Sequence, residues 1–405
     1  MKTKITVIIL ILSLTLSFVL SGCTDDVKNL SDKVEPDTYV LYDDIFKAED
    51  YTDFATKLFA ECLEGENSTL VSPLSVALAL AMVAEGANNE TLEEIKSTLG
   101  MDVEDLRKLA LSYLNSDEQL SMANSLWINN IDSFEVDKSF LQENSAYHNA
   151  DVFEIPFSTK AVKEINSWVS DKTEGMIDSI INELEPEAVM CLVNALLFDS
   201  KWEEVYDEHQ MDDGVFVTEK GETLPVKYMC SSESSYIKDE NGAGFVKYYE
   251  GRKYAFVALL PDEGISVEEY VSTLDGEKLE ELLENAEESE VHAKIPKFEY
   301  ETDLNLKSVL KDMGMEKAFD EEKADFSGLG QIKGGNIWIG DVLHSTKITV
   351  AEQGTKAGAS TAVVMRAAGV PQNPKEVTLD RPFVYMIVDM ENNIPIFMGT
   401  LMSVE

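Results

Sequence analysis

Four histidines are the side chains of this 405-residue chain best suited to general acid or base chemistry: His148, His209, His292 and His344. None has the H-E-x-x-H spacing of a zinc protease, and the sequence contains no G-x-S-x-G, P-loop or G-x-G-x-x-G motif. His344 lies in the apolar stretch 342–350, where we interpret it as a hydrogen-bonded core residue rather than a base. The 76 Asp and Glu residues are so numerous that no pair of them indicates catalysis. The sequence therefore predicts no enzyme and no metal or other cofactor.

The cysteines indicate neither a zinc site nor a disulfide framework. Cys62, Cys191 and Cys230 are odd in number and lack the spacing of metal ligands. The fourth cysteine, Cys23, follows directly on an apolar segment and belongs to a different pattern.

The N-terminus has the organisation of a targeting signal. Residues 1–4 are basic, residues 5–20 form an uncharged run of 16, and Leu-Ser-Gly-Cys follows at 20–23. Because a membrane-spanning helix needs about 18 apolar residues or more, we predict a cleaved signal peptide at 1–22. The pattern resembles a lipoprotein signal, which implies a lipid on Cys23. An ordinary signal or an uncleaved anchor are the alternatives, and each version places the protein outside the cytoplasm.

The net charge of −43 limits the partners of the chain. Nucleic acids are excluded, since phosphate binding requires clustered Lys and Arg. The acidity suits a soluble surface or a salty habitat. We interpret the acidic residues 23–44 as a tether between the membrane and a domain that starts at 45.

One long segment, E-Q-G-T-K-A-G-A-S-T-A-V-V-M-R-A-A-G-V-P-Q-N-P at 352–374, is unusual in so acidic a chain. No side chain between 357 and 365 carries a charge. Connections within a domain are usually about 4–6 residues, so a connection of this length is typical of a functional loop or a linker. Thr361, Val363 and Val364 favour β-structure, which linkers tend to lack. The segment is therefore predicted to be a loop that can also form a strand.

The elements around this loop indicate an α+β fold, because helices dominate the first half and strands the second. Ser72 and Pro73 form a helix start, as N-cap and first helical residue. Helical spacing predicts helices at 48–63, 74–84, 90–99, 103–114, 136–147 and 162–172, two more within 264–286, and one at 304–313. Strands are predicted at 121–128, 188–198, 254–260, 291–300, 337–350 and 383–388.

Several segments together resemble the serpin family, whose name denotes serine protease inhibitors. They are N-S-T-L-V-S-P-L-S-V-A-L-A-L-A-M-V-A-E-G-A-N-N-E-T-L-E-E-I at 67–95, V-N-A-L-L-F-D-S-K-W-E-E at 193–204, K-I-P-K-F-E-Y-E-T-D-L-N-L-K-S-V-L-K-D-M-G-M-E-K-A-F at 294–319, V-L-H-S-T-K-I-T-V-A-E-Q-G-T-K-A-G-A-S-T-A at 342–362 and D-R-P-F-V-Y-M-I-V-D-M-E-N-N-I-P-I-F-M-G at 380–399. They follow the family order from about residue 45 to the end. The resemblance implies one serpin-like α+β domain at 45–405, with about eight to nine helices, three β-sheets and an exposed reactive loop near the C-terminus.

The resemblance also implies a function for the loop at 352–374. In inhibitory serpins a protease cleaves this loop, and the cleaved loop then enters the main sheet as an extra strand before the acyl-enzyme is hydrolysed. The implied protein is a monomeric suicide-substrate inhibitor that forms a covalent complex with an extracellular serine protease. A non-inhibitory protein of the serpin fold, acting as a binding or surface module, is the alternative.

The loop residues match the family pattern in sequence order. By resemblance the hinge comprises Glu352, Gly354, Thr355, Ala357, Ala359 and Thr361. Period-two alternation places Thr355, Ala357, Ala359 and Thr361 on one face of an inserted strand. Family spacing indicates Ala368–Gly369 as the scissile bond, which suits elastase-like or subtilisin-like proteases. Cleavage after Arg366 by a trypsin-like or cysteine protease remains the alternative.

Two further groups of residues match positions that control insertion. The resemblance makes Ser72, Ser75, Asn194 and His344 a polar gate beneath the sheet, and it places Trp202, Lys297 and Glu352 where insertion starts. The chain departs from the family in having Lys356 where an acidic residue is usual and Gly358 where alanine is commoner. A glycine weakens a strand, so these departures affect the expected speed of insertion rather than its occurrence.

Overall fold

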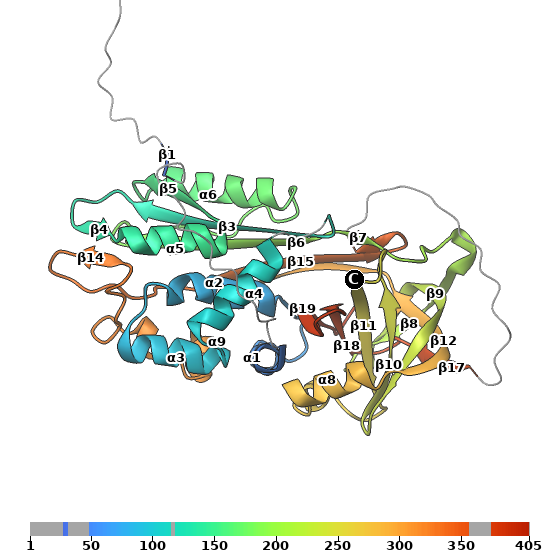
Figure 1. Cartoon of the computed structure of the whole chain (residues 1–405). Helices are drawn as coiled ribbons and strands as arrows, with labels where there is room; N and C mark the ends of the chain where they lie inside the picture. The colour runs from blue at the N-terminus through green and yellow to red at the C-terminus, as the bar shows by residue number, and fades with distance from the viewer. Residues whose placement is uncertain (1–26, 31–47, 115–117, 356–373, 405) are drawn as a thin grey trace, which may run out of the picture.

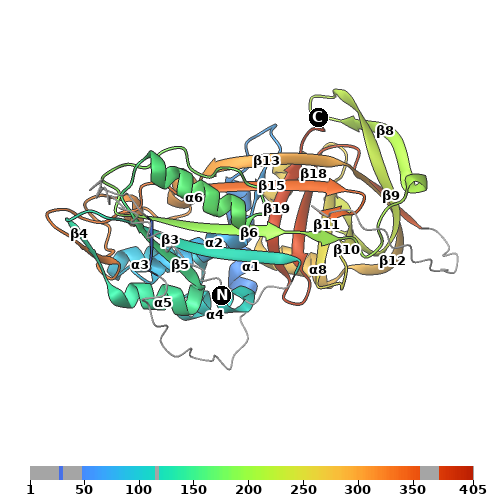
Figure 2. The same ribbon diagram turned by 90° about the horizontal axis from the view of Figure 1, so that it is seen from above.

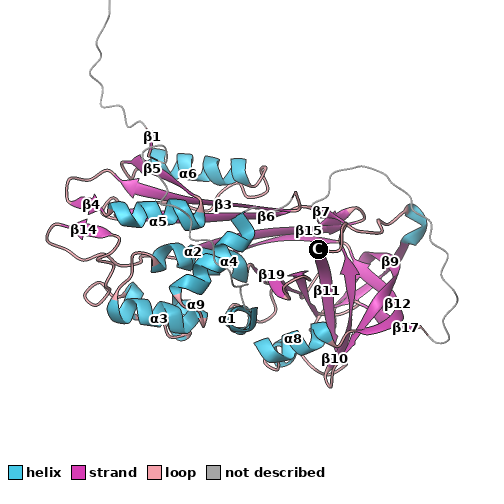
Figure 3. Cartoon of the chain, viewed as in Figure 1, coloured by secondary structure: helices cyan, strands magenta, loops and turns pink. Residues whose placement is uncertain are grey.

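The structure, a computed structural model, describes residues 27–30, 48–114, 118–355 and 374–404. Helices and strands are mixed in them as expected for an α+β fold, with most of the helices gathered towards one end (Figure 3). The helices of these residues are α1 (Ala48–Glu61), α2 (Pro73–Ala84), α3 (Asn89–Leu99), α4 (Val103–Leu114), α5 (Lys138–His148), α6 (Thr159–Lys172), α7 (Val267–Val271), α8 (Gly276–Glu284) and α9 (Lys307–Asp312). Each predicted helix is confirmed, with its ends displaced by a few residues at most.

Helix α2 lies at the centre of the molecule. Its N-cap is Ser72, whose side chain accepts a hydrogen bond from the Ser75 amide, and Pro73 occupies the first turn. Every residue of the helix except Ala79 is buried. A helix that is apolar on all sides must be covered on all sides. It therefore forms a fixed support beneath the main sheet.

The main sheet consists of two four-stranded halves. One has the order β1 (Lys28–Asn29), β5 (Ala150–Ile155), β3 (Leu120–Asn129) and β6 (Met190–Phe198). The other has the order β13 (Phe298–Asn305), β15 (Leu343–Ala351), β16 (Gly354–Thr355) and β7 (Ser200–Lys201). Figure 2 shows β6 and β15 running side by side where the halves meet, but the two strands do not form a ladder.

A nine-stranded sheet forms the other end of the molecule (Figure 1). Its strands are β17 (Lys375–Thr378), β12 (Glu287–Pro296), β9 (Thr223–Lys238), β10 (Gly242–Tyr248), β11 (Tyr254–Pro261), β18 (Phe383–Asp389), β19 (Ile394–Leu401) and β2 (Leu70–Val71), with β8 (Met211–Val217) paired to β9. All residues of β11, β18 and β19 are buried, so these strands form much of the core. A small sheet pairs β14 (Gly330–Ile332) with β4 (Phe134–Val136).

Three predictions about strands were incomplete. The single strand expected at 291–300 is two strands, because the chain leaves the nine-stranded sheet at Pro296 and enters the main sheet at Phe298. The strand expected from 337 begins at Leu343. Strands β8 and β9 were not predicted, since their many exposed residues hide the apolar alternation. Strand β10 was not predicted either, although all its residues are buried or half-buried.

The N-terminal segment is partly folded onto the domain. Lys28 and Asn29 pair with Glu154 and Phe153 at the edge of β5, and the Leu30 amide donates to the Val152 carbonyl at 2.7 Å. The predicted tether 23–44 therefore contains a strand of the main sheet. In the part of the chain that the structure describes, we find no helix with the length and apolarity needed to cross a membrane.

Candidate functional site

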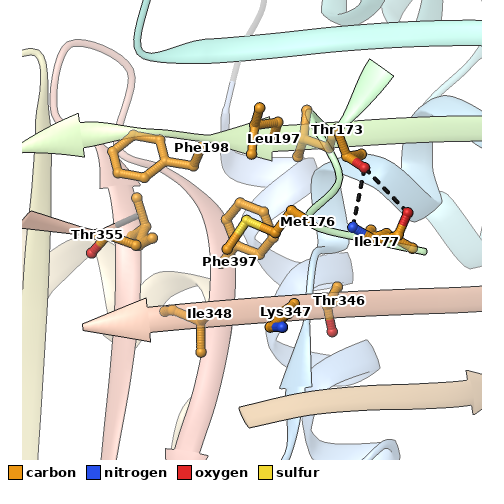
Figure 4. A pocket seen from close by; sticks show the side chains of 12 residues that line it. Thr173, Met176, Ile177, Leu197, Phe198, Thr346, Lys347, Ile348, Thr355 and Phe397 are labelled. Atoms are coloured by element: carbon orange, nitrogen blue, oxygen red, sulfur yellow. Dashed lines mark hydrogen bonds between the residues drawn. The ribbon is translucent and has the colours of Figure 1, made fainter. Parts of the chain in front are cut away.

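A narrow cleft with a cavity of about 20 Å³, roughly the space of one water molecule, lies between the two halves of the main sheet (Figure 4). Its walls are the C-terminal end of β6 and the middle of β15, and its floor includes Ile387 and Phe397. The segment after α6 contributes Thr173, Met176 and Ile177. The wall residues are Leu196, Leu197 and Phe198 on β6 and Thr346, Lys347 and Ile348 on β15. Strand edges that are not paired can accept a further strand, so the cleft is a place where one could be added.

One end of this cleft is already occupied by a short strand. Thr355 of β16 lines the cleft, pairs with Val350 of β15 on one side and with Ser200 of β7 on the other, and is 2% exposed. Its hydroxyl lies 2.6 Å from the Tyr249 hydroxyl. At this end of the cleft β16 therefore bridges β15 and β7, the short strand that follows β6 in the chain.

Gly354 is required by the close approach of β7. Its φ is 151°, and a Cβ added there would lie 2.0 Å from the Ser200 carbonyl oxygen and 2.7 Å from the Lys201 Cα. Both of these contacts are with backbone atoms, which cannot move aside as a side chain could. Only glycine fits at position 354, because the backbone has a positive φ and because a Cβ would collide with β7.

The turn before β16 is held through three carbonyl groups. The indole Nε1 of Trp202 donates to the Ala351 carbonyl at 2.8 Å, and the Trp202 amide donates to the Gln353 carbonyl at 3.0 Å. The Tyr206 amide donates to the Glu352 carbonyl at 3.0 Å. The Trp202 ring stacks on Tyr249 with a centroid distance of 4.5 Å. We call Trp202, Tyr206 and Tyr249 the hinge receptor.

An ion pair lies at the surface of the hinge receptor. Lys297 donates to the Glu352 carboxylate at 2.8 Å, and both side chains are about one-third exposed, at 39% and 34%. Partial burial acts to raise the pKa of Glu352, but the hydrogen bond from Lys297, a backbone hydrogen bond and the Lys297 charge together outweigh it and lower the pKa.

A buried polar cluster lies further along β6 and β15. The His344 Nε2 accepts a hydrogen bond from the Ser72 amide at 3.0 Å, so His344 must be unprotonated there. The Ser75 hydroxyl bonds Asn194 Oδ1 at 2.5 Å. Burial lowers the pKa of His344 to about 4, so the ring is neutral at pH 7 and suited to accept this bond. The cluster joins α2 to one strand from each half of the sheet.

The family can now be assigned. The family model described as "Serpin (serine protease inhibitor)" matches residues 49–404. The chain is a serpin. It therefore belongs to a family of protease inhibitors rather than enzymes, some of whose members do not inhibit.

Its relatives come from distant organisms. A serpin-like protein of Thermococcus kodakarensis is 31% identical over 364 residues, which cover 86% of this serpin and 84% of the relative. Serpin B6 of Pongo abelii is 31% identical over 84% of this chain and 94% of its own, and alpha-1-antitrypsin 1-4 of Mus musculus is 28% identical over 87% of each.

Solved serpin structures agree with the fold. The native state of the thermophilic serpin tengpin superimposes with a TM-score of 0.86 at 43% identity, covering 93% of this chain and all of tengpin. Tengpin in the latent state gives a lower TM-score, 0.80, at 39% identity over 91% of this chain.

The structure brings most of the predicted site residues into two groups. Trp202, Lys297, Glu352, Gly354 and Thr355 meet at the hinge receptor. Ser72, Ser75, Asn194 and His344 form the polar cluster, which we call the gate cluster. The remaining predicted positions lie outside the described residues: Cys23, Ala357, Ala359, Thr361, Arg366, Ala368 and Gly369.

Sequence reasoning missed four residues that complete these groups. Tyr206, Tyr249 and Lys247 belong to the hinge receptor or lie beneath it, and Asn124 extends the gate cluster by accepting from Asn194 Nδ2 at 2.7 Å. Tyr206 lies two residues after the matched motif at 193–204, and this closeness to Trp202 in the sequence could have indicated that it belongs to the same site. The positions of Asn124, Lys247 and Tyr249 depend on contacts between distant strands.

Proposed function

We propose that this serpin inhibits a serine protease outside the cytoplasm by inserting its cleaved loop into the main sheet. The supporting observation is the register of β16, in which Val350 lies opposite Thr355 and Ala351 opposite Gly354. Continuing that register would place Ala357, Ala359 and Thr361 opposite Ile348, Thr346 and His344. These three residues of β15 are all buried.

The side chains at these loop positions suit that destination. Residues directly opposite one another in an antiparallel pair have side chains on the same face, so the alanines and threonines would enter the core side. Small residues can pass between packed strands, whereas charged or bulky ones cannot be buried there without a large cost. Lys356 would lie on the other face.

Insertion would also satisfy the strand edges on both sides of the cleft. Adding seven to ten residues would make on the order of ten backbone hydrogen bonds, each contributing about 0.5–1.5 kcal/mol. That gain is comparable to the ~5–15 kcal/mol stability of an ordinary domain. The native form is then a kinetic trap that cleavage releases.

The test is a panel of proteases. The mature protein is incubated with elastase-like, subtilisin-like and trypsin-like enzymes, and the products are separated on denaturing gels. We expect a covalent band that survives denaturation, and a released C-terminal peptide beginning at Gly369, after cleavage at Ala368. A peptide beginning at Ala367 would assign cleavage to Arg366. Cleavage by every enzyme without a covalent band would contradict the proposal and favour a non-inhibitory binding function.

We also propose that the protein is anchored to a membrane through a lipid on Cys23. Strand β1 starts at Lys28, so the linkage from Cys23 can extend about 18 Å at most. The anchored domain would therefore be held close to the bilayer. Membrane fractionation and the mass of the N-terminal peptide test this, and Cys23→Ser is expected to release the protein into the soluble fraction. An unmodified Cys23 in membrane-associated protein would contradict the proposal.

A further inference from the structure

Lys247 is the most deeply buried lysine or arginine of the described residues. It lies on β10 with a side chain that is 2% exposed, and its Nζ donates to the Glu233 carboxylate of β9 at 2.9 Å. A second acceptor, the Glu204 carbonyl, lies at 3.4 Å. Two aromatic rings complete its surroundings, with the Tyr206 centroid at 4.5 Å and the Trp202 centroid at 5.4 Å from Nζ.

The two rings that face Lys247 belong to the residues that hold the hinge. Trp202 and Tyr206 supply all three donors to the carbonyls of residues 351–353. Trp202 also stacks on Tyr249, whose hydroxyl contacts Thr355. The ammonium of Lys247 therefore lies over the ring of Trp202, whose indole bonds the Ala351 carbonyl, and over the ring of Tyr206, whose main-chain amide bonds the Glu352 carbonyl.

The charge of Lys247 is maintained despite its surroundings. Burial opposes the ammonium form, but the interactions with Tyr206 and Glu233 outweigh this and hold the pKa of Lys247 above its ordinary value. A buried ion pair is often no more stabilising than apolar residues of similar volume. A cation fixed by a carboxylate and two rings does, however, define the position of those rings, because cation–π attraction depends on where the cation lies over the ring face.

We propose that Lys247 is a positioning residue for strand insertion: through Trp202 and Tyr206 it keeps the hinge seated in the sheet before cleavage. This inference rests on the proposed function. Inhibition is a competition between insertion and hydrolysis of the acyl-enzyme, so a hinge that is already seated begins insertion sooner. A hinge that is loosely held loses part of that advantage.

The first test needs no protease. Hydrogen exchange is measured on peptides covering residues 351–355 in the wild type, Lys247→Met and Lys247→Arg. We expect about tenfold faster exchange in K247M, since local opening of β16 becomes easier, and near-wild-type exchange in K247R, which retains a cation. Wild-type exchange in a folded K247M protein would overturn the inference.

The second test uses a protease that the panel identifies, or subtilisin as the first probe. The ratio of cleaved inhibitor to covalent complex is expected to rise about threefold to tenfold in K247M and to return close to the wild-type value in K247R. If the wild type forms no covalent complex with any enzyme, the proposed function fails, while the exchange measurement still decides the role of Lys247.

A matched control separates positioning from general stability. Lys317 bonds Glu94 at 2.7 Å between α3 and the chain that follows α9, in the helical end of the molecule. Lys317→Met removes the same side chain from an ion pair, and we expect it to leave exchange at 351–355 and the product ratio unchanged. An equal effect in K317M would overturn the inference. Should K247M fail to fold, Glu233→Gln retains the lysine and is expected to change both readouts in the same direction by a smaller factor.

Discussion

The main sheet is paired differently at the two ends of the cleft. At the hinge receptor a strand is present: β16 pairs on both sides, and three carbonyls of the preceding turn are bonded to Trp202 and Tyr206. Further along, β6 and β15 do not pair, and a cluster of Ser, Asn and His side chains lies beside them. One region holds the beginning of an added strand, and the other has two neighbouring strands that are not hydrogen-bonded to each other and must separate to admit the remainder.

The difference shows how a loop can be ready to insert without inserting. The hinge receptor is assembled from aromatic stacking and from hydrogen bonds to main-chain carbonyls, which do not have to break when the strand grows. The gate cluster is a buried hydrogen-bond network that crosses both halves of the sheet, and it continues from Asn194 through Asn124 to the His148 carbonyl at 2.6 Å. Such networks are costly to leave partly unsatisfied, so the gate cluster resists separation of the strands.

Thr355→Arg is expected to have the largest effect on the difference between the hinge receptor and the gate cluster, because it removes the strand from the hinge receptor. Thr355 is 2% exposed and bonded to Tyr249, so a guanidinium there would be buried without a partner. The hinge should leave the sheet, and the inhibitor should become a substrate that forms no detectable covalent complex on denaturing gels. Thr223→Arg, at an exposed position of β9, is the control and should inhibit normally. Unchanged inhibition by T355R would exclude insertion at this position.

The second effect, also at the hinge, is expected from Gly354→Val. The new side chain would collide with the backbone of Ser200 and Lys201, so β16 would separate from β7. We expect exchange at 351–355 to rise by about tenfold or more and the covalent fraction to fall accordingly. Gly340→Ala is the matched control, since a Cβ at Gly340 has no neighbour within 4 Å. Equal effects at both positions would mean that the contact with β7 is not what holds the hinge.

These two residues also show what the sequence could and could not predict. The hinge and gate positions were predictable because they lie in segments of fixed family order, and the helices because their periodicity and caps are local. The division of the main sheet was not predictable, since the strands on its two sides are separated by more than a hundred residues in the chain. The same reason hid Lys247, an exposed-type residue whose burial depends on Glu233 and on two rings of another segment.

The third prediction concerns the gate cluster and uses pH. Because the pKa of His344 falls from 6.5 to about 4 in the fold, the unfolded chain takes up its proton first as the pH decreases. Stability should be unaffected by this group above pH 6.5, decrease between 6.5 and 4, and level off below 4. The full loss is about 3 kcal/mol, and protonation also removes the acceptor for the Ser72 amide.

The measurement for this group is the difference between wild type and His344→Gln. Many carboxylates of this acidic chain titrate in the same range, and they are common to both proteins. The stability of the wild type relative to H344Q should therefore fall between pH 6.5 and 4. Hydrogen exchange at 351–355 should show no such trend: the ratio of the wild-type rate to the H344Q rate should be the same at each pH. A constant stability difference across this range would show that His344 does not carry the pH dependence.

The smallest effect is expected from Glu352→Gln, although Glu352 lies within the hinge. Both members of its ion pair with Lys297 are about one-third exposed or more, so the pair contributes only about 0.2–1 kcal/mol. The Glu352 carbonyl, by contrast, remains bonded to Tyr206 in the variant, because that bond uses the main chain. Exchange at 351–355 should rise by less than about fivefold at low salt, and the difference should largely disappear near 1 M salt.

The control for this prediction is Asp213→Asn, which breaks an exposed ion pair between Asp213 on β8 and Lys227 on β9. It should not change exchange at the hinge at either salt concentration. A change in E352Q as large as that in G354V would mean that the surface ion pair, rather than the buried hinge receptor, holds the strand in place.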